Sequence, residues 1–69
     1  MSDIETLKAE IKKLSSKSVN TKMNLHDLSE DLPTGWENIL TVAQETYDTF
    51  KALDDARKAL AALQAGAAA

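Results

Sequence analysis

Pro33, the only proline of this 69-residue chain, lies almost at its middle. The 30 residues before it, 3–32, contain neither glycine nor proline. A proline disfavours helical geometry in the residue that precedes it, so a helix is expected to end at Leu32. The sequence therefore predicts one helix over 3–32, a turn at 33–34 and a second helix over 35–65. Helices joined by so short a turn must lie antiparallel.

The first half has the apolar spacing of a coiled-coil seam, with alternating intervals of three and four. Its members are Ile4, Leu7, Ile11, Leu14, Leu25, Leu28 and Leu32. The same count passes through Ser18 and Thr21, so the middle of the seam is small and polar. Ser2 and Glu5 match a capping box, which predicts a helix start near Asp3.

The second half also repeats apolar residues at helical spacing. They are Trp36, Ile39, Leu40, Ala43, Tyr47, Phe50, Leu53, Leu60 and Leu63. In an antiparallel pair with its turn at Pro33, facing positions have numbers that sum to about 68. This register places Ser18 and Thr21 opposite Phe50 and Tyr47. Large side chains against small ones would fill the seam densely.

The ends of the second helix are also marked in the sequence. Thr34 and Glu37 form a second capping box, which predicts Thr34 as the N-cap. Gly66 is a typical helix stop, and the alanines at 67–69 are expected to fray. The whole hairpin, 1–66, is a single domain.

The size and composition of the chain indicate that it needs a partner. A chain this short buries only about 60% of the surface its unfolded form exposes. Small scaffolds usually add disulfides, a metal or another chain, and cysteine is absent here. We therefore expect an all-α, coiled-coil-like hairpin that is completed by dimerisation or by docking on a partner.

The charge and hydropathy of the chain restrict the kind of partner and the location. Eleven Asp and Glu against eight Lys and Arg give a net charge of −3, which argues against nucleic acid. No stretch approaches the roughly 20 apolar residues of a membrane span. The first residues, "MSDIETLK", lack the features of a signal peptide, so a cytoplasmic location is expected.

A candidate partner-binding surface lies near the predicted turn. Val19, Met23 and His26 fall on the side of the first helix that points away from the second. Acidic residues in the last turns of a helix are unfavourable with its dipole, and a basic partner would compensate for them. Trp36 at the hairpin end would suit an interface anchor. The predicted partner-binding residues are Val19, Met23, His26, Asp27, Glu30, Asp31 and Trp36.

Metal binding and catalysis have weaker signals. His26 and Glu30 are four residues apart and share a helix face. His26 together with Glu30 or Asp27, contributed by two chains, could bind iron, nickel or manganese. Two ligands make no site by themselves, so no resident metal or cofactor is expected and a solvated helix end is favoured. One histidine and no recognisable base for the serines argue against an enzyme.

Three segments resemble a known family: "LKAEIKKL", "KMNLHDLSEDLPTGWENI" and "AQETYDTFKALDDARKAL". They are similar to the Rop-like proteins encoded with nitrogen-fixation genes, a family that includes nitrogenase-associated factor T. The most specific part is "LHDLSEDLPTGW", residues 25–36. The resemblance implies an antiparallel hairpin that associates further. It also implies an accessory role around nitrogenase during assembly, turnover or protection, with the molybdenum–iron component as partner.

Two other functions stay open at this point. One is a carrier of divalent iron or nickel, based on His26 and its neighbouring carboxylates. The other is RNA binding by analogy with Rop, through the lysines of the first helix: Lys8, Lys12, Lys13, Lys17 and Lys22. Acids interleave with those lysines, which favours a solvated, neutralised face.

Overall fold

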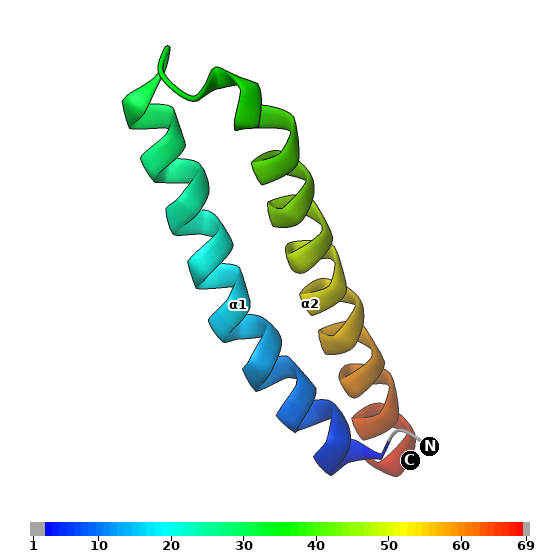
Figure 1. Cartoon of the computed structure of the whole chain (residues 1–69). Coiled ribbons are helices and arrows are strands. Elements are labelled where there is room, and N and C mark those ends of the chain that lie inside the picture. Colours follow the sequence, from blue (N-terminus) through cyan, green and yellow to red (C-terminus); the bar gives the residue numbers. More distant parts are fainter. Residues whose placement is uncertain (1–2, 69) are drawn as a thin grey trace.

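The protein is a rod of two antiparallel helices in a computed structural model that describes residues 3–68 (Figure 1). Helix α1 spans Ile4–Asp31, a short 3-10 turn η1 spans Trp36–Asn38, and helix α2 spans Ile39–Ala68. The rod measures 53 × 18 × 15 Å, with the loop at one end and both ends of the chain at the other. The predicted all-α antiparallel hairpin is confirmed. Within 3–68, neither helix is long and apolar enough to cross a membrane.

Helix α1 begins at an aspartate cap. The Oδ1 atom of Asp3 accepts a hydrogen bond from the backbone N–H of Thr6, at 2.8 Å. This bond satisfies one of the free N–H groups at the helix start. The same hydrogen bonding from Thr6 holds the pKa of Asp3 below its ordinary value. Ser2 of the predicted capping box lies outside the described residues.

The lowered pKa of Asp3 predicts an acid-sensitive helix start. A carboxylate with a depressed folded-state pKa stabilises the fold at pH values above its unfolded pKa of about 3.9, and this contribution is lost as the pH falls through the folded value. We expect Asp3→Asn to lose less stability than wild type when the pH is lowered, because the Asp3 carboxylate is no longer there to be protonated. Melting followed by circular dichroism between pH 7 and pH 2 measures it, with Glu5→Gln as control. If the melting temperatures of wild type and Asp3→Asn fall equally as the pH is lowered, the prediction is contradicted.

The loop between the helices is built on Pro33 and Gly35. The Leu32 N–H still bonds to the Leu28 carbonyl at 3.2 Å, but the ψ of 141° at Leu32 leaves helical geometry, as expected before proline. Gly35 has a φ of 80°, the left-handed region that glycine adopts most easily. The predicted N-cap at Thr34 is wrong, because Gly35 precedes η1 and no side chain caps that turn.

Helix α2 continues further than its sequence suggests. The predicted end at residue 65 is wrong, because the helix passes through Gly66 and runs to Ala68. A glycine inside a helix costs only about 1 kcal/mol relative to alanine, and the surrounding alanines are the best helix formers. Residues 67 and 68 belong to α2, Ala69 lies outside the described residues, and the fraying of 67–69 stays a prediction.

The contact between α1 and α2 is apolar toward the termini and hydroxyl-lined in its middle. Its buried hydrophobic residues are Leu7, Leu53 and Ala56, and its buried polar residues are Ser18, Thr21 and Thr49. The hydroxyl groups of Ser18 and Thr21 donate to carbonyls of their own helix, from Ser18 to Ser15 at 2.7 Å and from Thr21 to Ser18 at 3.0 Å. Burying these two hydroxyl groups therefore costs little free energy, because each has a hydrogen-bond acceptor.

A contact between Thr46 and the backbone of Thr21 shows the register of the two helices. The Oγ1 atom of Thr46 donates to the carbonyl of Val42 at 2.8 Å and lies 3.3 Å from the carbonyl of Thr21 on α1. Facing positions therefore have numbers that sum to about 67, within one residue of the prediction. The residues predicted to fill this layer are wrong, however. Tyr47 and Phe50 are exposed, and Thr49, at 4% exposure, is buried in their place.

Candidate interaction surface

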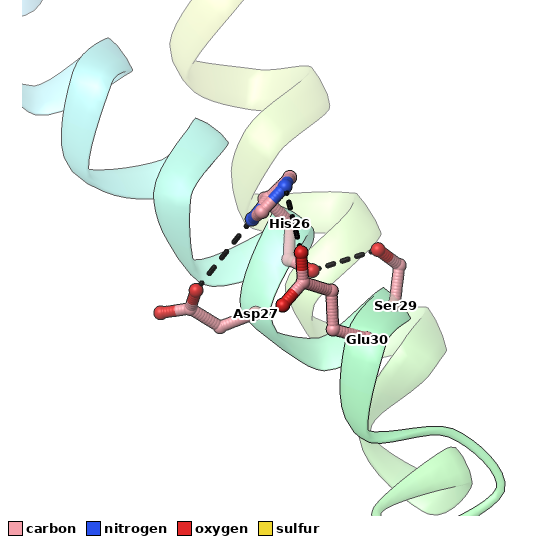
Figure 2. A network of polar contacts seen from close by, with 4 residues as sticks. All are labelled: His26, Asp27, Ser29 and Glu30. Carbon is pink, nitrogen blue, oxygen red and sulfur yellow. Dashed lines mark hydrogen bonds and ion pairs between the residues drawn. The ribbon is translucent and has the colours of Figure 1, made fainter.

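A polar cluster occupies the last turns of α1, next to the loop (Figure 2). The Nε2 atom of His26 lies 3.2 Å from Oε1 of Glu30, and its Nδ1 atom lies 3.6 Å from Oδ1 of Asp27. Ser29 donates its hydroxyl to the His26 carbonyl at 2.7 Å. All four side chains are exposed, so the cluster is open to a partner.

The same cluster does not by itself form a metal centre. Among the described residues, no three or more His, Asp and Glu side chains are placed to hold a metal ion together. Each ring nitrogen of His26 faces a carboxylate of its own helix. A metal site would need ligands from a second chain, and divalent-metal binding stays a prediction.

The loop end of the rod is acidic. Residues 23–44 contain Asp27, Glu30, Asp31 and Glu37 but neither lysine nor arginine. The last turn of α1 carries no basic residue. The C-terminus of a helix has a partial negative charge, which adds to that of these carboxylates. This end of the molecule would therefore attract a cationic surface.

The remaining predicted partner-binding residues are also accessible. Val19 and Met23 are exposed on α1. Trp36, at 64% exposure, begins η1 on the other side of the loop. Exposure permits contact with a partner, and the binding role of these residues stays a prediction.

A second surface was missed by the sequence analysis because its residues were assigned to the core. Leu40, Ala43, Tyr47 and Phe50 recur at intervals of three and four along α2, and we name them the α2 stripe. Leu40 is 82% exposed and Tyr47 is 65% exposed. Spacing alone does not separate this stripe from the buried seam, because Leu53, Thr49, Thr46 and Val42 recur at the same intervals of four and three.

Comparison with known proteins identifies the family. A protein-family model described as Rop-like matches residues 2–65. The chain belongs to the Rop-like family. A solved NMR structure from the Northeast Structural Genomics Consortium is 49% identical to this Rop-like protein, with a TM-score of 0.85 over 91% of this chain and 89% of that chain.

Relatives of this Rop-like protein occur in several bacteria. A UPF0437 protein of Azorhizobium caulinodans is 81% identical over the full length of both chains. The UPF0437 protein y4xE of Sinorhizobium fredii is 47% identical over 90% of this chain and 92% of its own. A relative in Frankia alni, 48% identical over 70% of this chain and 58% of its own, is described as a UPF0437 protein in the nifX-nifW intergenic region.

Proposed function

We propose that this protein is a non-catalytic accessory protein of nitrogen fixation, located in the cytoplasm, that binds the molybdenum–iron component of nitrogenase during its assembly, turnover or protection. The position of the Frankia relative between nifX and nifW supports the association with nitrogen fixation. The observation that carries a binding role is the acidic loop end, where exposed carboxylates stand without lysine or arginine over residues 23–44.

The shape of the molecule favours binding over catalysis. Leucine, alanine, serine and threonine side chains are buried between the two helices, and the His26 cluster lies on an exposed helix surface. Enzyme sites are usually concave and exclude water from the reacting groups. An open, charged helix end is better suited to contact with a larger protein. Self-association stays a prediction beside this proposal, and so does RNA binding.

The proposal predicts that reversing charges at the loop end weakens capture of the nitrogenase component. We expect the double variant Asp27→Lys and Glu30→Lys to bind purified molybdenum–iron protein at least tenfold more weakly than wild type. Both side chains are exposed, so the fold should persist. Immobilised wild-type and variant proteins, titrated with the purified component at about 0.15 M salt, provide the measurement.

The control for this experiment is an equal charge reversal at the other end of the rod. Glu5→Lys combined with Glu10→Lys changes the net charge by the same amount, and both residues are exposed on α1. Unchanged affinity in this control, with loss in the loop-end variant, supports the proposal. Equally weakened binding by both variants would show that net charge, and not the loop end, determines affinity. Absence of binding by the wild type would contradict the proposed function.

A further inference from the structure

One face of the hairpin exposes apolar side chains from both helices. In each helix the a and d positions of the heptad form the seam, the e positions lie beside a, and the g positions lie beside d. With Ile4 and Ile39 as a positions, the register places a of one helix opposite d of the other, so the e positions of both helices lie on the same side. We name the side formed by the a and e positions the e face. Its accessible apolar residues are Ile4, Ile11, Leu25, Leu32, Ile39, Ala43, Phe50 and Leu60.

The e face has no acidic side chain along its flanks. Within α1 and α2 its e positions are Lys8, Ser15, Lys22, Ser29, Ala43, Phe50, Arg57 and Gln64. The opposite flank, at the g positions, includes Glu10, Asp31 and Glu45. Lys17 lines a shallow groove on that side with Glu45 and Asp48. Covering a carboxylate costs free energy unless it is paired, so the e face is the side of the hairpin that another protein covers most readily.

The surface left open by the single hairpin is large enough for a stable dimer. Its accessible area is 5271 Å². A typical folded monomer of 7.5 kDa exposes about 4,200 Å². Two copies that each cover the excess of about 1,000 Å² would bury about 2,000 Å² in total, which is where the range for permanent homodimers begins.

Charge is distributed unevenly along the rod. Because facing positions sum to about 67, residues 17–50 make up the loop half, and the remaining residues make up the terminal half. The loop half contains six carboxylates against Lys17 and Lys22, a net charge of −4. The terminal half contains five carboxylates against six lysines and arginines, a net charge of +1. The two halves therefore have opposite signs.

The charges of the two halves favour one orientation of a second copy. Two copies packed head to head would place one loop half of charge −4 on another, and like charges at contact distance repel. Two copies packed head to tail would place each loop half on a terminal half of charge +1. Lys8 and Arg57, at e positions of the terminal half, would then lie beside the loop half of the other copy. The head-to-tail pair avoids the main repulsion and covers the same apolar face.

Dimers are common among proteins of the Rop-like fold. We propose that two copies of this chain pair through the e face, head to tail, so that the loop half of each copy lies on the terminal half of the other. Facing positions 17 and 50 mark the middle of the rod, so Phe50 lies close to the two-fold axis of the dimer and near its own counterpart.

This arrangement determines where the acidic loop ends lie in the dimer. Asp27 and Glu30 occupy c and f positions of α1, which point away from the seam. They therefore stay uncovered, with one loop end at each end of the dimer. A head-to-tail dimer offers two separate sites for a cationic partner, whereas a head-to-head dimer would offer a single, doubly charged end. The pairing itself does not depend on the function proposed above.

A spin label in the loop measures the orientation of the two copies. The chain has no cysteine, so Thr34→Cys, at an exposed position, carries one label per copy. Residue 34 lies about 17 residues from the middle of the rod, so head-to-tail pairing separates the two labels by about 50 Å. Head-to-head pairing separates them by less than about 35 Å, because only the width of two hairpins lies between them. We expect double electron–electron resonance to give the longer distance. The shorter distance would overturn the proposal.

A label at the middle of the rod is the matched control. Ser16→Cys, at an exposed position of α1, gives a distance below about 35 Å in either orientation. Its signal shows that the labelled protein is paired under the conditions of the measurement. If neither position gives a distance and light scattering finds only monomers at the same concentration, the proposal is overturned.

A pair of substitutions tests which face is covered. We expect Phe50→Glu to raise the dissociation constant of the dimer at least tenfold, because it brings two carboxylates together near the two-fold axis. Ala52→Glu adds the same charge at an exposed g position of α2 and should change the constant less than twofold. Sedimentation equilibrium measures both constants, and equal values for the two variants would overturn the proposal.

Two features keep these outcomes separable from other effects. Phe50 is 41% exposed in the single hairpin, so Phe50→Glu is expected to keep its helices, which circular dichroism checks. The distance between labels at residue 34 is measured without that variant and decides the orientation even if it fails to fold. Every sample contains only this protein, so the result is separate from that of the proposed function.

Discussion

Leu53→Ala is expected to lower the free energy of unfolding by about 3 kcal/mol, within the usual range for a buried leucine. Leu53 is 4% exposed and is one of the few buried apolar side chains of the described hairpin. A domain of this length has a total stability of only about 3–10 kcal/mol. The variant should therefore lose between about a third and all of its stability. Urea unfolding of wild type and variant, followed by circular dichroism at 222 nm, measures the difference.

Leu40→Ala is the matched control for this substitution. It removes the same atoms from the same helix, but Leu40 is almost fully exposed in the single chain. At micromolar concentration and without a partner we expect a change below about 0.5 kcal/mol. A larger effect of Leu40→Ala than of Leu53→Ala would show that the α2 stripe, and not the threonine seam, is the core of the hairpin.

The antiparallel hairpin could be predicted from the sequence, because few folds are compatible with both the central proline and the apolar spacing of the two halves. Pro33 forbids a continuous helix, and the heptad spacing before it requires a partner for one helix face. The conformation of the loop was harder to predict from the sequence. Thr34 and Gly35 both carry valid start signals, a capping box and a left-handed turn, and the structure uses Gly35. Local sequence gives no rule for choosing between them.

The identity of the core residues on α2 could not be predicted from apolarity. Two rows with the same spacing lie side by side, one with Thr46 and Thr49 and the other with Tyr47 and Phe50. The hydroxyl of Thr46 is satisfied by the Val42 carbonyl, so its burial is not penalised. The small residues Ser18 and Thr21 on α1 accept an equally small layer on α2. The choice therefore depends on how closely the helices approach, which is a property of the pair.

The sequence predicted that the candidate residues are exposed, but it did not predict what they bind. The intervals of four, three and four among Val19, Met23, His26 and Glu30 predicted an outward line, and the structure exposes these residues. The partner is a different matter, because an open helix face has no cavity whose shape selects a ligand. The negative charge of the loop end indicates only that a partner would be positively charged there, and the α2 stripe could be recognised only after the buried seam was located.

Gly35→Ala is expected to destabilise the hairpin by about 1–2 kcal/mol. The φ of Gly35 is 80°, a conformation that side chains other than glycine adopt at a cost. An added Cβ would also lie 3.3 Å from Cδ1 of Leu28, which is tighter than an ordinary contact. Both effects act on the loop that holds the helices antiparallel. Thermal and urea unfolding at 222 nm measure the loss.

The same substitution at the other glycine should have the opposite sign. Gly66 lies inside α2, and an added Cβ there would meet nothing within 4 Å. Gly66→Ala should therefore raise stability by up to about 0.5 kcal/mol, because alanine favours the helix and the final turns of a helix contribute less than its interior. A loss at position 66 or a gain at position 35 would contradict the assigned backbone of that glycine. Opposite signs would show that Gly35 is required by its conformation, whereas Gly66 is tolerated within a helix that would form more readily without it.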